Sequence, residues 1–260
     1  MKMSLFVSVF CCATSYAIMA QAVCTPAPDC ASLGYTKTSA DCEGKIAVKC
    51  PTDTSKVFCK VIEIGSILYG DGTVTRELLR NKTPIGVVFD TDNRLAVALT
   101  DVKEDGTVGT EAMHWTGGPY DIPNLENCTD ITAGTELVSF TCGIDGRANT
   151  DKILSCTWAN CFGTPAAKAC NLYEPAGCTK DFCKNTKWFL PSLRDLQNMY
   201  INKNLLNSTL SASGGKTLNF QYWSSTEYNY NSAWRFVTNS LKEVNSKNRL
   251  LNYVRPVVAY

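Results

Sequence analysis

The sequence has little of what the commonest metal and catalytic sites require. It contains a single histidine, His114, and no C-x-x-C pair, so the usual spacing of a zinc site is missing. No serine lies in a Gly-x-Ser-x-Gly motif, and a Ser/His or Cys/His nucleophile could form only through His114. We therefore predict no metal, no cofactor and no catalytic residue, so that the chain is not an enzyme.

An excess of charge of one sign is also lacking. Lysine and arginine number 25 against 24 acidic residues, and no basic block occurs anywhere in the chain. Nucleic-acid binding and electrostatic membrane binding both depend on such an excess, so neither is expected. Beyond the first residues, no apolar run approaches the roughly 20 residues of a membrane span.

The N-terminus has the pattern of a secretory signal. A basic start, Met1-Lys2-Met3, is followed by a mostly apolar run, 4–19, and by the small-residue cleavage pattern Ala20-Gln21-Ala22. We therefore predict a signal peptide at 1–22 and an exported chain without a transmembrane span. Periplasm, cell surface and extracellular medium all remain possible destinations.

Cysteines are plentiful in the rest of the chain, and an even number in an exported protein predicts disulfides. Their pairing cannot be read from the sequence. Five precede Val61 and seven follow it, so either one bridge joins the two parts or a thiol stays free. The twelve predicted disulfide cysteines are Cys24, Cys30, Cys42, Cys50, Cys59, Cys128, Cys142, Cys156, Cys161, Cys170, Cys178 and Cys183.

The pattern along the chain divides it into a cysteine-rich module, 23–60, and a larger domain, 61–260. The module is so short that it needs covalent help to fold, and short strands are expected near 33–36 and 46–49. The larger domain has strand-like segments before its helix-like segments and again at its end, which favours an α+β domain with an antiparallel sheet. The expected strands are 64–69, 85–89 and 94–99, with a hairpin loop at 91–93 and an irregular, disulfide-clamped region at 101–151.

Two helices are predicted in this domain. Thr164-Pro165 is a helix start with proline at the first position, and the helix is expected to reach Tyr173. Ser192-Leu-Arg-Asp195 resembles a capping box, after which Leu193, Leu196 and Met199 repeat at helical spacing.

The C-terminal stretch 222–260 has aromatic and β-branched ends, but more than half of the residues at 224–252 are Asn, Ser, Thr or Tyr. Tyrosine offers rigid contact area and Asn and Ser offer adaptable hydrogen bonds, a composition typical of binding loops. We predict polar loops that face a ligand, held by Trp223, Trp234, Tyr253 and Arg255, with Tyr228, Tyr230 and Arg235 as energetic centres. A solvated hairpin without function is the competing interpretation. The predicted ligand contacts are Tyr228, Asn229, Tyr230, Asn231, Ser232, Arg235, Phe236, Thr238, Asn239, Ser240, Lys242, Ser246, Asn248, Arg249 and Asn252.

Five segments occur in an order that resembles a known family. They are Ile64-Gly-Ser-Ile-Leu-Tyr-Gly-Asp-Gly-Thr, Thr83-Pro-Ile-Gly-Val-Val-Phe, Trp188-Phe-Leu-Pro-Ser-Leu-Arg-Asp-Leu, Tyr222-Trp-Ser-Ser-Thr-Glu and Tyr253-Val-Arg-Pro-Val. Together they resemble the C-terminal, C-type-lectin-like domain of bacterial collagen-like adhesins, which has a sulfatase-modifying-factor-like fold. The resemblance covers about 61–260 and implies a lectin-like domain whose first and last strands pair.

Some members of that family are variable proteins of diversity-generating retroelements. The Asn, Tyr and Ser positions at 228–232 and 235–252 are similar to their diversified codons. The cysteine pair of formylglycine-generating relatives is missing, because no cysteine follows Cys183. Glu174-Pro-Ala176 departs from the calcium-lectin pattern Glu-Pro-Asn, so a calcium-bound sugar is not expected.

These observations predict a secreted or cell-surface, adhesin-like protein that binds an unidentified protein or glycan, with a host or neighbouring cell as the source. Two alternatives stay open. One is a structural envelope or pilus-associated subunit. The other is a glycan hydrolase that uses Glu227 and Glu243 as its carboxylate pair.

Overall fold

The computed structural model describes residues 35–37, 46–50, 53–60, 62–156, 161–239 and 241–260, and side chains from residue 62 onward. The chain divides into two compact units, Met1–Ile62 and Glu63–Tyr260. The predicted signal peptide lies outside the described residues.

The first unit contains a small antiparallel sheet. Its strands are β1 (Tyr35–Lys37), β2 (Ile46–Cys50) and β3 (Asp53–Lys60), in the order β1-β3-β2. Strands were expected near β1 and β2, whereas β3, which pairs with both, was not predicted.

The second unit begins with an antiparallel five-stranded sheet in the order β11-β7-β6-β4-β5. The strands are β4 (Ile67–Tyr69), β5 (Val74–Thr75), β6 (Pro84–Asp90), β7 (Leu95–Ala98) and β11 (Val257–Ala259). The predicted β6–β7 hairpin is confirmed. The expectation that the first and last strands pair is wrong: β5 and β6 occupy both edges of β4, so β11 pairs with β7 instead.

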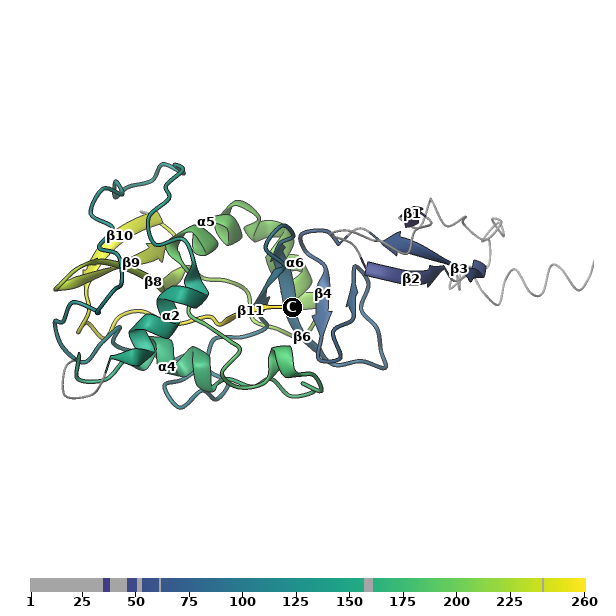
Figure 1. Ribbon diagram of the computed structural model, residues 1–260, viewed down its shortest axis with the longest axis horizontal. Coiled ribbons are helices and arrows are strands. Elements are labelled where there is room, and N and C mark those ends of the chain that lie inside the picture. Colours follow the sequence, from purple (N-terminus) through teal and green to yellow (C-terminus); the bar gives the residue numbers. More distant parts are fainter. Residues whose placement is uncertain (1–34, 38–45, 51–52, 61, 157–160, 240) are drawn as a thin grey trace, which may run out of the picture. The chain divides into compact units, whose positions relative to one another are not determined.

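A second antiparallel sheet replaces the polar loops expected near the C-terminus. It is formed by β8 (Gln221–Asn229), β9 (Ser232–Val237) and β10 (Leu241–Ser246), in the order β10-β9-β8. Figure 1 shows these strands in yellow and green beside α5. The loop prediction failed because large apolar residues, Trp234 and Phe236, alternate with the polar ones and point into the core.

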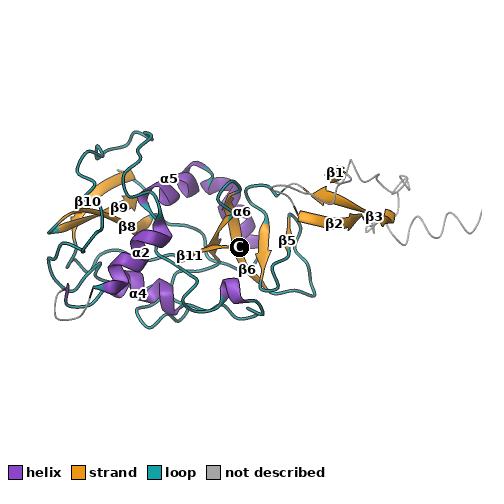
Figure 2. Cartoon of the chain, in the orientation of Figure 1, coloured by secondary structure: helices purple, strands orange, loops and turns teal. Residues whose placement is uncertain are grey.

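Four α-helices are present among the described residues: α2 (Gly146–Ser155), α4 (Pro165–Leu172), α5 (Leu193–Ile201) and α6 (Lys203–Ala212) (Figure 2). A 3-10 turn, η1, covers Asp181–Cys183. The predicted helices correspond to α4 and α5, whereas α2 and α6 were missed, so the expectation of two helices is corrected. The α+β class with antiparallel sheets is confirmed.

The core of this unit lies where both sheets meet α5 and α6. Val97 of β7, Leu196 of α5, Leu206 of α6 and Phe236 of β9 all belong to one buried cluster. The C-terminal sheet is thus fixed on the same core as the five-stranded sheet.

Three disulfides close loops in the second unit: Cys128–Cys142, Cys156–Cys161 and Cys178–Cys183. Cys170 is buried in α4 without a disulfide. In the part of the chain with described side chains, a free thiol therefore accounts for the odd number of cysteines. Glu126 lies within metal-binding reach of Cys128 and Cys142, but those sulfurs are bonded to each other.

Within the ranges that the structure describes, no helix is both long enough and apolar enough to cross a membrane.

Candidate binding surface

The pairing of β8 with β9 separates the predicted contact residues into two groups. Gln221 pairs with Val237 at one end of the hairpin, and Asn229 pairs with Ser232 at the other. Strands rise about 3.3 Å per residue, so the two ends of β9 lie about 17 Å apart. The structure therefore does not bring all the predicted contacts together.

The first group, here called the hairpin tip, comprises residues 228–232 together with Ser246, Asn248 and Arg249. Its turn is fixed by the Asn229 side chain, whose Oδ1 accepts hydrogen bonds from the backbone N–H groups of Asn231 (2.9 Å) and Ser232 (3.1 Å). Tyr230 is 52% exposed at this turn. A rigid turn thus presents an aromatic side chain to solvent.

A buried ion pair lies beneath the hairpin tip. Glu227 and Lys247 have no exposed side-chain area, and the lysine Nζ donates to Glu227 Oε1. The same Nζ donates to the backbone oxygens of Tyr120 (2.5 Å) and Tyr230 (3.2 Å), and it lies over the ring of Trp115. The Lys247 backbone N–H also donates to Asn231 O at 3.0 Å. Lys247 therefore ties the turn to the interior through several bonds.

Burial governs the titration of this pair. It raises the pKa of Glu227 to about 7, against the opposing effect of Lys247, and it lowers the pKa of Lys247. Glu227 Oε1 also accepts the Ile122 N–H, whereas Oε2 has no hydrogen-bond partner. The hydrogen bonds of Glu227 thus connect the hairpin tip to the Ile122 backbone.

This arrangement removes the carboxylate pair that a glycan hydrolase was expected to use. Glu227 is sealed from solvent, so it cannot reach a sugar without rearrangement. Glu243 instead accepts hydrogen bonds from Arg235 Nε (3.1 Å) and Nη2 (2.5 Å).

The second group of predicted contacts lines a groove of about 370 Å³ at the opposite end of the sheet. Arg235, Thr238 and Asn239 were predicted, and the structure brings them together there. The Arg235 guanidinium is fixed by Glu243 and by Asn252 Oδ1, to which its Nη1 donates at 3.0 Å.

Five further residues of this groove were not predicted from the sequence. Strand pairing supplied the missing signal, because Arg235 pairs with Glu243 and Val237 pairs with Gln221 across neighbouring strands. The residues that sequence analysis missed are Asn219, Phe220, Gln221, Val237 and Glu243.

Three predicted ligand contacts are corrected because their side chains are buried. Phe236 packs against the rings of Tyr200 and Phe220 in the core. The Lys242 Nζ donates to the backbone oxygen of Glu136, and the Asn252 Oδ1 accepts from Arg235. None of the three presents its side chain to solvent.

Tyr228 is less exposed than a ligand contact was expected to be. Tyr228 is half-buried, since its ring packs edge-on against Trp234 at a centroid distance of 5.5 Å. It therefore supports the hairpin tip more than it is displayed by it. Ser240 lies outside the described residues.

The four residues expected to hold this surface are buried or partly buried. Trp223, Trp234 and Arg255 are fully buried, and Tyr253 is partly buried. The indole N–H groups donate to backbone oxygens, from Trp223 to Met113 (2.8 Å) and from Trp234 to Cys128 (2.9 Å). Arg255 lies 2.8 Å from Asp101 in a fully buried ion pair.

The single histidine, His114, was not expected to be catalytic. Its buried Nδ1 finds no hydrogen-bond acceptor or donor among the described residues. No carboxylate therefore orients His114 through Nδ1 in the part of the chain that the structure describes.

Comparisons with known proteins place the chain in no family. No family model matches the sequence, and no curated protein matches it. One solved structure, a fimbrial protein from Bacteroides ovatus, aligns with 77% of this chain at 15% identity and a TM-score of 0.48. The alignment covers 49% of that protein, so the chain spans about half of its length. The lectin-like fold stays a prediction.

Proposed function

We propose that this chain is an exported, adhesin-like binding protein. In this proposal a disulfide-stabilised domain, lectin-like as the sequence resemblance implies, displays the hairpin tip and the groove to a ligand and catalyses no reaction. The ligand is a protein or glycan on a host or neighbouring cell.

The exposed Tyr230 on its fixed turn carries this proposal. A tyrosine offers a large contact area while few of its torsions must be ordered on binding. Here the backbone beneath it is already held by Asn229 and by Lys247. A surface ordered before binding loses less conformational entropy when the ligand arrives.

Export is supported by the cysteines. Three disulfides in one unit are typical of an oxidising compartment and rare in a reducing cytosol. They fit the signal peptide that the N-terminal sequence predicts.

The separation of the two groups favours a macromolecular ligand. A small molecule cannot span the roughly 17 Å between the ends of β9, whereas a protein surface or an extended glycan can contact both. Within this proposal the hairpin tip is the main contact, because the groove's arginine is already paired with Glu243.

Diversification of the hairpin tip is a further part of the proposal. Some of the positions that resemble retroelement targets, among them Asn231 and Asn248, are exposed at the hairpin tip, while Trp223 and Trp234 are buried. A reverse transcriptase gene and a near-copy of these codons beside this gene would be the decisive observation.

Replacing Tyr230 tests the binding surface. We expect Tyr230→Ala to weaken binding of the fluorescent chain to epithelial and bacterial cells at least about fivefold, as at other aromatic hot spots. Flow cytometry measures the binding, and circular dichroism checks the fold. The matched control is Phe162→Ala, since Phe162 is equally exposed, at 52%, and lies outside both groups.

If Tyr230→Ala binds cells as well as the unmodified chain does, the hairpin tip is not the binding surface. An equal loss in Phe162→Ala would mean that any exposed aromatic residue matters and would also overturn it.

A further inference from the structure

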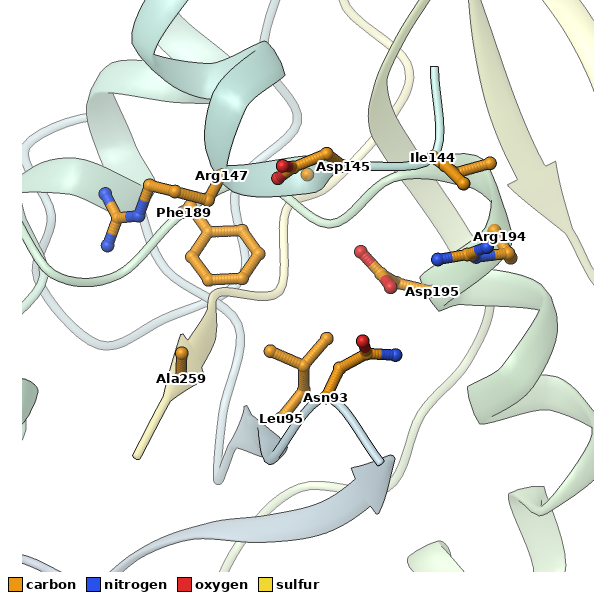
Figure 3. A pocket seen from close by; sticks show the side chains of 10 residues that line it. Asn93, Leu95, Ile144, Asp145, Arg147, Phe189, Arg194, Asp195 and Ala259 are labelled. Atoms are coloured by element: carbon orange, nitrogen blue, oxygen red, sulfur yellow. The ribbon is translucent and has the colours of Figure 1, made fainter. Parts of the chain in front are cut away.

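A second cavity, of about 400 Å³, lies away from the C-terminal sheet. Four segments that are distant in the sequence build it: the β6–β7 turn with β7, the start of α2, the segment from Phe189 to the start of α5, and the end of β11. Figure 3 shows Asp195 pointing into it from α5, Asp145 at its edge beside the start of α2, and Leu95 and Phe189 on its walls.

The helices bring their own carboxylates to this cavity. Asp145 caps α2, its Oδ1 accepting the Ala148 N–H at 2.9 Å, and Asp195 Oδ2 accepts the Ser192 N–H at 2.8 Å in the capping box of α5. Gly146 permits this approach, since a Cβ there would lie 2.9 Å from Asp195 Oδ2. The helix starts are therefore already neutralised by carboxylates, which disfavours an anionic ligand.

Asp195 is 3% exposed, and its second oxygen, Oδ1, has no hydrogen bond to any described residue. Its carboxylate is directed into the cavity (Figure 3). Burial raises the pKa of Asp195 to about 6; the hydrogen bonds of Ser192 and the charge of Arg194 oppose the increase, and Asp90 adds to it. The Oδ1 atom is therefore an open acceptor at the cavity wall for a donor that enters the cavity.

The cavity has two arginines that could donate to the Asp195 carboxylate, and they differ in orientation. The Arg147 guanidinium is turned away: it donates to the backbone oxygens of Thr186 (3.0 Å) and Lys187 and lies over the Phe189 ring. Figure 3 shows it pointing out of the cavity. Arg194 is the remaining cation, and it is partly exposed.

We propose that this cavity binds a primary ammonium group on an apolar stem, the chemistry of a lysine side chain. The ammonium has three donors for the free oxygens of Asp195 and Asp145. Its methylene stem would lie along Leu95, Ile144 and Phe189. A divalent cation fits less well, because no third acidic group of the described residues lies within shared coordination reach of the two aspartates.

Calorimetric titration of the full exported chain tests this site. The probes are Nα-acetyl-lysine methylamide, its Nε-acetylated form, which lacks the charge, and n-butylamine. We expect the first and third to bind and the acetylated form to fail. Tighter binding of the lysine derivative than of n-butylamine indicates a lysyl side chain as ligand, whereas equal binding indicates a free amine.

Variants locate the site. Asp195→Asn is expected to weaken binding about tenfold and Asp145→Asn at least about threefold, because asparagine keeps the capping acceptor and loses the charge. The control is Asp130→Asn, an exposed aspartate outside the cavity. Affinity of the unmodified chain is expected to fall as the pH drops below about 6 and Asp195 protonates.

Binding of the acetylated probe equal to that of the charged one would overturn the proposal. So would unchanged affinity in both cavity variants, or an equal loss in Asp130→Asn. Should Asp195→Asn fail to fold, the Asp145→Asn result alone decides.

Discussion

At the scale of single residues, Lys247 is the side chain on which the hairpin tip depends most. Its buried ammonium bonds Glu227, Tyr120 O and Tyr230 O at once. We predict that Lys247→Met destabilises the fold by about 3 kcal/mol, because Glu227 is left buried without its cation and two backbone oxygens lose a donor. Urea unfolding measures the loss.

The matched variant is Lys247→Met with Glu227→Gln, whose amide does not ionise. The folded pKa of Glu227, about 7, already exceeds its ordinary 4.5, and loss of Lys247 raises it further. The contribution of Glu227 to the stability of the single variant is therefore most favourable below pH 4.5 and is lost as the pH rises through the folded pKa, at 7 and above. The free energy of unfolding of the double variant, relative to that of the single variant, is expected to increase with pH. A gap between the two variants that stays constant from pH 5 to pH 8, in urea titrations, would contradict this account.

Individual contact residues could be predicted from the sequence only in part. Composition located the polar stretch, and Tyr230, Thr238 and Asn239 are indeed exposed. Composition could not show that Phe236 and Lys242 face inward, because the direction of a side chain follows from strand register. The buried role of Lys247 had no signal, since an isolated lysine is normally at the surface.

At the scale of secondary-structure elements, the capping box of α5 is a prediction that local sequence made well. Ser192 Oγ accepts the Asp195 N–H and Asp195 accepts the Ser192 N–H. We expect Ser192→Ala to lower the free energy of unfolding by about 1 kcal/mol or more, since the freed N–H is buried. Thr164→Ala is the control, because Thr164 begins α4 without a side-chain capping bond. Equal losses in thermal unfolding would argue against the capping box as the cause.

Of the two missed helices, α2 lacks a clear apolar period. Helix α2 buries Gly146, Asn149 and Thr150 alongside Ile153, so most of its inner face is small or polar. Helix α6 does carry Leu206 and Leu210 one turn apart, a usable signal within a run rich in Ser and Asn. In β8–β10, pairing between strands satisfies the backbone of residues whose composition is typical of loops.

At the scale of the whole molecule, local patterns predicted the α+β class and the β6–β7 hairpin, but not the pairing of the last strand, β11, with β7. The β6–β7 hairpin has a short turn and two apolar strands, so it is readable locally. The pairing of β11 with β7 joins segments some 160 residues apart, which no local pattern encodes. The same holds for the Cys128–Cys142 bridge, whose partners could not be chosen among twelve cysteines.

Cys170 offers a readout of whole-domain opening. It is fully buried, and burial raises the pKa of its thiol, so the reactive thiolate is scarce in the folded state. Without reductant, we expect iodoacetamide to leave Cys170 unmodified in buffer and to alkylate it in urea, at a rate that follows the unfolded fraction. Peptide mass mapping identifies the alkylated cysteine. The control is Cys170→Ala, which is expected to abolish alkylation within residues 63–260. Rapid labelling of Cys170 in buffer would show that α4 opens locally. No labelling after unfolding would show that the Cys170 sulfur is paired. Either result contradicts a free thiol that is buried in a single cooperative core.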